Sequence, residues 1–332
     1  MTTAVLICDD SSMARKQMAR TLADGWDVAL SFASNGVEAL AAIKEGKGDV
    51  LFLDLNMPVM DGYETLQAIN REDLPTMVIV VSGDIQPDAQ QRASKLGALA
   101  FIRKPVVKEE VFEILSQYGI VSEAGAVAIA APEASGSVGI MDCYQEVANV
   151  AMGQAADLLA RLLGVFVVLP VPNVNLLEPS ELQMALAQTT EEASVSAVSQ
   201  GFIGGGIAGE ALLLFHDSNF EQIARLMHYE GEVDDAMERE LVMDVASILI
   251  GACVKGLAAQ LDVSFSQGHP VILGQHVNMA HLVDGKACSW SKTLAIEISY
   301  TLEDVDISFD LLLLIAEDSL PTVDGKLAFM LE

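Results

Sequence analysis

Apolar runs and amphipathic stretches alternate through the first third of the chain. Five short runs rich in β-branched residues occur at Ala4–Cys8, Asp27–Phe32, Val50–Asp54, Met77–Val81 and Ala98–Ile102. Between them lie segments whose apolar positions recur at the three-to-four-residue period of a helix. Strands and helices alternating in this way predict an α/β fold with a parallel, doubly wound sheet over residues 1–121.

Polar residues follow four of these five strands. Asp9 and Asp10 come after the first, Asp54 ends the third, Ser82 follows the fourth and Lys104 the fifth. Each alone has a structural explanation, as a cap or a surface charge, but the carboxyl ends of parallel strands converge on one ligand site. Three carboxylates repel one another unless a hard cation such as Mg²⁺ lies between them. A lysine and a hydroxyl beside a carboxylate nucleophile suit phosphoryl oxygens, so the set predicts aspartate phosphorylation.

The motifs that carry these residues resemble the CheY-like receiver domain of two-component response regulators. They are CDDS at 8–11, DLNMPVMDG at 54–62, VSGD at 81–84 and FIRKP at 101–105, and the resemblance covers residues 3–120. It implies a flavodoxin-like (βα)5 fold and a cytoplasmic protein phosphorylated by a cognate histidine kinase. It also implies that Asp54 is the phosphoacceptor and that Asp9, Asp10, Asp54 and the backbone carbonyl of Asn56 hold Mg²⁺.

The same resemblance implies roles for three further residues. Ser82 and Lys104 contact the phosphoryl group, and Phe101 occupies an aromatic switch position that moves with Ser82 on phosphorylation. A plain core aromatic is the other interpretation of Phe101.

Residues 122–140 separate this region from the rest of the chain. They are rich in Ala, Gly and Ser and show no sustained period, which predicts a flexible linker. Val127–Ala131 could instead dock on a neighbouring surface.

Residues 141–332 contain an internal repeat with an offset of 98 residues. Matching pairs include Asn149 with Ser247, Gly153 with Gly251, and Pro172 with Pro270. Each copy, about 142–235 and 236–332, begins with a helix that carries a stripe of small residues and continues into a strand-like segment near a proline. Two such units predict a pseudo-twofold α/β domain. The glycine-rich run Gly201–Phe215 predicts a strand, a glycine turn and a second strand.

One edge of the first repeat helix is polar. Asp142, Glu146 and Asn149 lie at i, i+4 and i+7, so this edge faces water or a partner. The spacing from these residues to Pro172 resembles the signature of the CheC, CheX and FliY phosphatases, which hydrolyse the phospho-aspartate of chemotaxis receivers. That resemblance covers roughly residues 142–332. It implies that the Asn149 amide orients the attacking water and that Glu146 engages the receiver's lysine.

The second copy departs from this signature, because Asp244 and Ser247 stand where the first has Glu146 and Asn149. A serine is too short to replace the amide, so the second site is expected to be inactive. Three hypotheses remain open: a phosphatase acting on another CheY-like receiver, one acting on its own Asp54, and a non-catalytic binding module. The binding module would be controlled by phosphorylation and would dock at a flagellar switch, a chemotaxis adaptor or a chemoreceptor array.

Composition narrows the choice of partners. The chain has 18 basic and 47 acidic residues, and its net charge of −29 disfavours nucleic acids and anionic lipids as ligands. Most of this charge belongs to residues 122–332, with 7 basic and 30 acidic residues. The plain interpretation is a solvated surface; a cation-binding face is the other.

The cysteines, the histidines and the apolar segments argue against several classes of site. The four cysteines have no CxxC spacing and are expected to be reduced thiols, and the five histidines show no paired spacing that would predict a metal site. The first residues lack the basic region of a signal peptide, and the apolar run 158–177 is broken by an arginine and two prolines, so no membrane insertion is expected. The sequence leaves the oligomeric state open, with a homodimer among the outcomes.

Overall fold

The chain forms two compact units in the computed structural model. The structure describes residues 2–23, 26, 28–121, 139–178, 181, 194–231, 233–277, 292–305 and 307–331. The units divide at Glu146 and Val147. Most of the expected linker lies outside the described residues, as does Val127–Ala131, so the boundaries 1–121, 122–140 and 141–332 stay a prediction.

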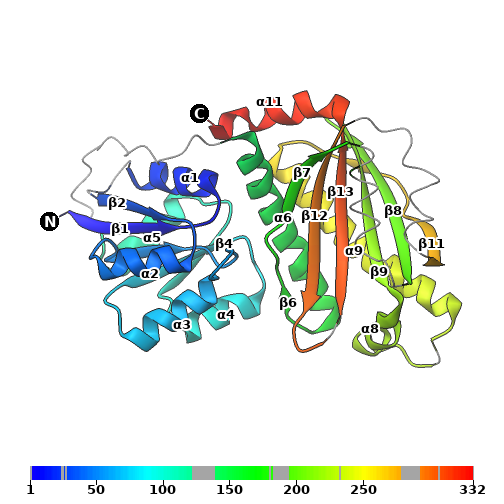
Figure 1. The fold of residues 1–332 in the computed structure, drawn as a ribbon, viewed down its shortest axis with the longest axis horizontal. Helices are drawn as coiled ribbons and strands as arrows, with labels where there is room; N and C mark the ends of the chain where they lie inside the picture. Colours follow the sequence, from blue (N-terminus) through cyan, green and yellow to red (C-terminus); the bar gives the residue numbers. More distant parts are fainter. Residues whose placement is uncertain are drawn as a thin grey trace. The chain divides into compact units, whose positions relative to one another are not determined.

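The first unit is built on a five-stranded parallel sheet of order β2-β1-β3-β4-β5 (Figure 1). All five predicted strands are present within one or two residues of their expected bounds. The strands are β1 (Thr3–Cys8), β2 (Val28–Ala33), β3 (Val50–Leu53), β4 (Met77–Ser82) and β5 (Ala100–Arg103). The helices between and after them are α1 (Ser12–Ala23), α2 (Gly36–Lys44), α3 (Gly62–Glu72), α4 (Pro87–Lys95) and α5 (Lys108–Gln117).

The central strands of this sheet are apolar on both faces because helices cover both. Every residue of β3 is buried. Alternate residues such as Phe52 and Ile79 pack with α1 and α5 in one apolar cluster, whereas Leu51 and Val80 point to the opposite face and are also buried. Continuous apolar runs of this kind are typical of parallel strands between two helical layers.

The second unit repeats one order of elements twice. The first copy contains α6 (Ile140–Leu163), β6 (Val167–Val168), β7 (Asn173–Leu177), β8 (Val195–Gly204), β9 (Ile207–His216), η1 (Asp217–Asn219) and α8 (Phe220–Leu226). The second contains α9 (Asp235–Gln260), β10 (Ser266–Gln267), β11 (Val271–Val277), β12 (Thr293–Leu302), β13 (Ser308–Ala316), η3 (Glu317–Ser319) and α11 (Leu320–Leu331). Both β7 and β11, and both β8 and β12, begin 98 residues apart, which is the offset seen in the sequence.

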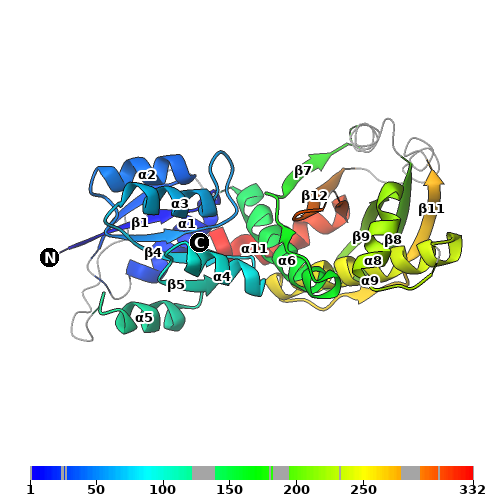
Figure 2. The ribbon, with the colours of Figure 1, turned by 90° about the horizontal axis from the view of Figure 1, so that it is seen from below.

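The two copies interlock through one sheet. Its order is β10-β8-β9-β13-β12-β6, with β7 added beside β12 and β11 beside β8, so each copy pairs a strand with the other copy (Figure 2). In the central pair, Leu213 of β9 lies opposite Leu311 of β13, a residue 98 positions later. A pseudo-twofold axis therefore passes between these two leucines.

One feature of the expected second domain was wrong. Its helices and strands do mix, but the strand pairings of the described residues in this sheet are antiparallel. For β8 with β9 and for β12 with β13, antiparallel pairing follows from the short connections, which leave no room for a crossover helix. The predicted glycine hairpin is confirmed, because β8 and β9 are joined by Gly205 and Gly206, at φ +58° and +81°, the left-handed conformations that a two-residue turn of this type requires.

The long helices α6 and α9 meet through small residues. A Cβ placed on Gly256 of α9 would come within 2.8 Å of the Ala151 Cα of α6, so a glycine permits this close approach. By length and composition alone α9 could cross a membrane, but 67% of its apolar window is buried inside the molecule, as expected of a core helix. Among the described cysteines, Cys8, Cys143 and Cys253 are buried and free.

A half-buried ion pair between neighbouring strands makes the stability of the second unit depend on pH. His216 Nε2 lies 3.5 Å from Asp310 Oδ2, and Ser299 Oγ donates to Asp310 Oδ1. The hydrogen bond to Asp310 raises the pKa of His216 above 6.5, and, against the effect of burial, the bonds from His216 and Ser299 lower the pKa of Asp310 below 3.8.

We expect this pair to stabilise the fold fully between about pH 4 and 6.5, where both groups are charged, by about 1 kcal/mol. Because the folded-state pKa of His216 is raised, the contribution is lost as the pH rises through that value. Urea unfolding of the wild type and of His216→Gln should differ at pH 6 and converge above pH 8. An equal difference at both values would contradict the charged pair.

Candidate functional site

The carboxyl ends of β1 and β3 bring three acids together. Asp9 and Asp10 follow β1, Asp54 follows β3, and one carboxylate oxygen from each lies within 4.8 Å of the others. Asp9 and Asp54 are 4% and 3% exposed. Backbone amides fix their orientation, because Ser11 N donates to Asp9 Oδ1 at 2.9 Å and Asn56 N donates to Asp54 Oδ2 at 3.0 Å.

Lys104 lies beside these carboxylates. Its Nζ is 2.8 Å from Asp9 Oδ2 and 3.4 Å from Asp54 Oδ1. Burial works against its charge, but Asp54 and Asp9 raise the pKa of Lys104 well above 10.5, so it is a permanent cation here. The lysine amide also donates to the carbonyl of Ser82, which holds the ends of β4 and β5 together.

The other predicted residues have simple positions. Ser82 is fully buried at the end of β4, and its Oγ accepts a hydrogen bond from Asp84 N. Asn56 is half-buried in the loop after β3, and Phe101 is half-buried on β5.

The charges in this site are poorly balanced by protein groups alone. Burial, with a further contribution from the charge of Asp9, raises the pKa of Asp10 to about 7. Burial also raises the pKa of Asp54, with Asp9 and Asp10 adding to the effect and Lys104 opposing it. Asp10 Oδ1 is buried and has no hydrogen-bond partner among the described residues. Crowded carboxylate oxygens with an unpaired acceptor fit a hard divalent cation such as Mg²⁺.

One residue of this site was missed from the sequence. The Arg15 guanidinium, on the first turns of α1, donates to the backbone carbonyls of Asp9 and Asp10. It therefore fixes the loop that carries both acids. A basic residue one turn into the helix after an acidic pair is a weak signal, because it is also common as a surface charge.

The second predicted site lies on α6. Glu146 and Asn149 are three residues apart and share one side of this helix. Both are only 5% exposed, whereas the sequence predicted an edge that faces water or a partner. Glu146 Oε2 and Asn149 Oδ1 are buried without a hydrogen-bond partner among the described residues. Asp142 of the same edge accepts two hydrogen bonds at Oδ2, from Gly139 N at the start of the helix and from Ser12 Oγ at 2.7 Å.

In the second copy, the side chains at the equivalent positions form hydrogen bonds with neighbouring residues. Ser247 Oγ donates to the Met243 carbonyl one turn earlier, at 2.7 Å, and Asp244 Oδ2 accepts from the Tyr229 hydroxyl. The two copies therefore differ in geometry as well as in sequence.

The strand ends of this parallel five-stranded sheet carry acids, a serine and a lysine. These are the side chains that the sequence analysis assigned to an aspartate phosphorylation site. Residues 5–116 match the family model described as the response regulator receiver domain. The chain is 33% identical over 116 residues to the chemotaxis protein CheY of Halobacterium salinarum, covering 35% of this chain and 96% of that protein. The chain belongs to the response regulator receiver family, and its first unit is a receiver of two-component signalling.

Two further proteins, one compared by sequence and one by structure, match parts of the chain. The positive alginate biosynthesis regulatory protein of Pseudomonas aeruginosa is 33% identical over 137 residues, covering 41% of this chain and 54% of that protein. The chain thus spans about half the length of that relative. The crystal structure of Thermotoga maritima FliY is 17% identical, with a TM-score of 0.42, and the match covers 57% of this chain and 96% of FliY.

Proposed function

We propose that this response regulator is phosphorylated on Asp54 and that its second unit is a CheC-like hydrolase of the phospho-aspartate of a CheY-like receiver. The observation that supports the hydrolase is the Asn149 amide. Its oxygen is buried without a hydrogen-bond partner among the residues that the structure describes, one turn from a Glu146 oxygen in the same condition. Unpaired buried polar atoms cost roughly 1–3 kcal/mol each, so they are retained where a ligand or a reaction uses them.

In the receiver, an Asp54 oxygen attacks the phosphorus of a phosphohistidine on a cognate kinase. The new P–O bond forms as the P–N bond breaks, and the imidazole leaves. Lys104 and Ser82 contact the phosphoryl oxygens. Asp9, Asp10, Asp54 and the Asn56 carbonyl would hold Mg²⁺, which supplies charge neutralisation when bound.

In the hydrolase step, a water oxygen attacks phosphorus and the bond to the aspartate oxygen breaks, releasing phosphate and the free carboxylate. The receiver already supplies the electrophile, so water orientation is the missing element. The Asn149 amide can accept from the water and donate to it without repelling the phosphoryl group. Glu146 would dock on the lysine of the substrate receiver, whether that receiver belongs to another protein or to this chain.

The second copy should contribute nothing to hydrolysis. Ser247→Ala removes a hydroxyl that bonds only to its own helix among the described residues, so the rate of phosphate release should stay within about twofold of wild type. Steady-state phosphate release with a phosphorylated receiver checks this. A large loss would mean that both copies are active.

The test of the proposal is phosphate release from two phosphorylated substrates, the isolated residues 1–121 and a separate CheY-like chemotaxis receiver, with and without the full chain. The proposal predicts faster release in the presence of the full chain. The substrate that responds identifies the preferred receiver. Unchanged release from both would refute the hydrolase.

The degenerate second copy favours one other function, a binding module without hydrolysis. In that case Glu146 and Asn149 would dock a flagellar switch or chemoreceptor-array protein, under control of phosphorylation at Asp54. The phosphate-release experiment distinguishes the two functions. A binding module would slow the loss of phosphate from its partner or leave it unchanged, whereas a hydrolase would accelerate it. Either function places the protein in the cytoplasm, where its kinase and partners are found.

A further inference from the structure

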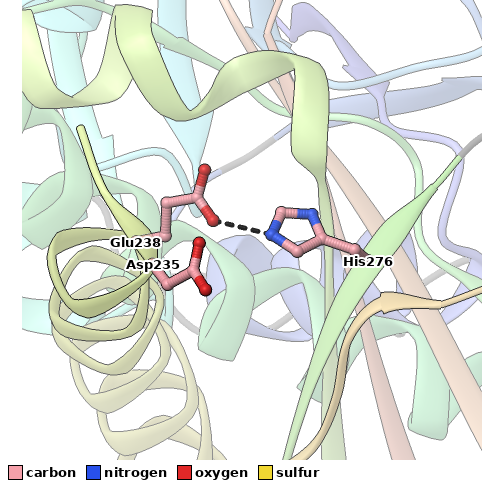
Figure 3. A group of neighbouring side chains, drawn as sticks. All are labelled: Asp235, Glu238 and His276. Atoms are coloured by element: carbon pink, nitrogen blue, oxygen red, sulfur yellow. Dashed lines mark ion pairs between the residues drawn. The ribbon is translucent and has the colours of Figure 1, made fainter.

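Three ligand atoms meet at the start of α9, away from the residues used above. Asp235 and Glu238 lie on its first turns and His276 lies on β11 (Figure 3). In Figure 3 both carboxylates point toward the imidazole ring. His276 Nε2 is 2.8 Å from Glu238 Oε2, and the candidate ligand atoms of all three residues lie within 4.8 Å of one another.

The other side of the His276 ring is fixed by a carboxylate. Its Nδ1 lies 3.0 Å from Asp217 Oδ2. Asp217 is held in turn by two hydroxyls, since Ser196 Oγ donates to Oδ1 at 2.8 Å and Ser194 Oγ donates to Oδ2. In the tautomer with the proton on Nδ1, Asp217 accepts that hydrogen bond and the Nε2 lone pair faces Glu238. A carboxylate that orients a histidine in this way is the usual partner of a metal-ligating imidazole.

The facing atoms need a positive charge between them. Glu238 Oε2 is buried and has no hydrogen-bond partner with acceptable geometry among the described residues. A carboxylate oxygen and an imidazole lone pair 2.8 Å apart repel each other unless a proton or a metal ion is shared. Asp217, Asp235 and Glu238 together carry a charge of −3 around one histidine. One added proton leaves −2, whereas a divalent ion leaves only −1.

We propose that Asp235, Glu238 and His276 bind a divalent transition-metal ion of the zinc type, with Asp217 as the residue that positions His276. An imidazole nitrogen with carboxylate oxygens suits Zn²⁺ better than Mg²⁺ or Ca²⁺, which prefer oxygen alone. Bonds of about 2.0–2.2 Å place two ligands of a tetrahedral ion roughly 3.3 Å apart. The Nε2–Oε2 pair reaches that spacing with a small opening of the two side chains.

The proposed site is partly exposed to water, and its ligands come from separate segments of the second unit. Asp235 is exposed and the His276 side chain is 47% exposed, so water can complete the coordination. The ligands join the start of α9 to β11, and Asp217 joins them to the end of β9. Binding would hold three segments of the second unit together and would stabilise its folded state.

Zinc binding by the full chain tests the proposal, with excess Mg²⁺ present throughout to saturate the receiver acids. After treatment with a chelator and its removal, titration with Zn²⁺ should show one tight equivalent per chain and a higher thermal midpoint. Co²⁺ should give the visible absorption of a low-coordinate site. His276→Ala should lose the tight equivalent, and Asp217→Asn should weaken it by about 10- to 100-fold.

His269→Ala is the matched control, because His269 is an exposed histidine just before β11 and should bind zinc like the wild type. Circular dichroism of each variant without metal separates loss of binding from loss of folding. Equal zinc binding by wild type and His276→Ala would overturn the proposal. So would the absence of a tight equivalent in wild type, in which case a proton alone occupies the gap between His276 and Glu238.

Discussion

Replacing Asn149 by alanine should lower the rate of phospho-aspartate hydrolysis by at least about 100-fold, the cost of losing the orientation of a reacting group. The loss should appear in kcat, since a water-orienting amide acts on the reaction step, whereas a docking residue would act on KM. The fold should be kept, because the alanine removes a buried acceptor that has no partner in the described part of the chain. Phosphate release at a series of phosphorylated-receiver concentrations separates the two parameters.

Two further variants sharpen this prediction. Asn149→Asp has nearly the same size but carries a charge that repels the phosphoryl group, so it should be as inactive as Asn149→Ala. Glu146→Gln should raise KM more than it lowers kcat, because its proposed role is docking. If Asn149→Asp keeps the wild-type rate, the amide does not orient the water.

The receiver fold follows from the sequence because its signals are local and consistent. The run Val50–Leu53 is apolar throughout, which in a parallel sheet means a strand covered on both faces, and β3 is buried at every position. The acids after β1 and β3 could be grouped without coordinates, because parallel topology alone puts strand ends at one edge.

The second unit shows where such inference ends. The 98-residue offset gives the repeat, and the Leu213–Leu311 pair lies on its axis, but the offset carries no information about strand direction. For α6 the spacing placed Glu146 and Asn149 on one edge that faces water or a partner, and both side chains are buried. Helical spacing tells which residues share a side of a helix, and it does not tell what covers that side.

The cluster at His276 could not be predicted from the sequence, for a different reason. Glu238 and Asp217 are 38 and 59 positions from the histidine, and no short spacing links them. Long-range pairing of β11 with β8 brings His276 to them, at a place where the pairing register shifts and the backbone φ of His276 is +52°. Such a bulge redirects a side chain, and nothing in the residue pattern announces it.

Asp54→Ala should abolish phosphorylation of the chain, because among the described residues no other acid stands in the same relation to Asp9, Asp10 and Lys104. Incubation with a small-molecule phosphodonor and Mg²⁺ should add one acid-stable, base-labile phosphoryl group to wild type and none to the variant, as measured by intact mass. Asp88→Ala, which removes an exposed acid at the start of α4, should be phosphorylated like wild type. Transfer to Asp9 or Asp10 in the Asp54 variant would contradict the assignment.

The same variant decides how the two units are coupled. If phosphorylation of Asp54 controls the hydrolase, a phosphodonor should change the rate at which wild type dephosphorylates a separate receiver, and it should leave the Asp54→Ala rate unchanged. If the chain acts on itself, the Asn149→Ala chain should retain its own phosphoryl group at least about 100-fold longer than wild type. Equal rates for wild type and Asp54→Ala, with and without the donor, would mean that the hydrolase works independently of the receiver to which it is joined.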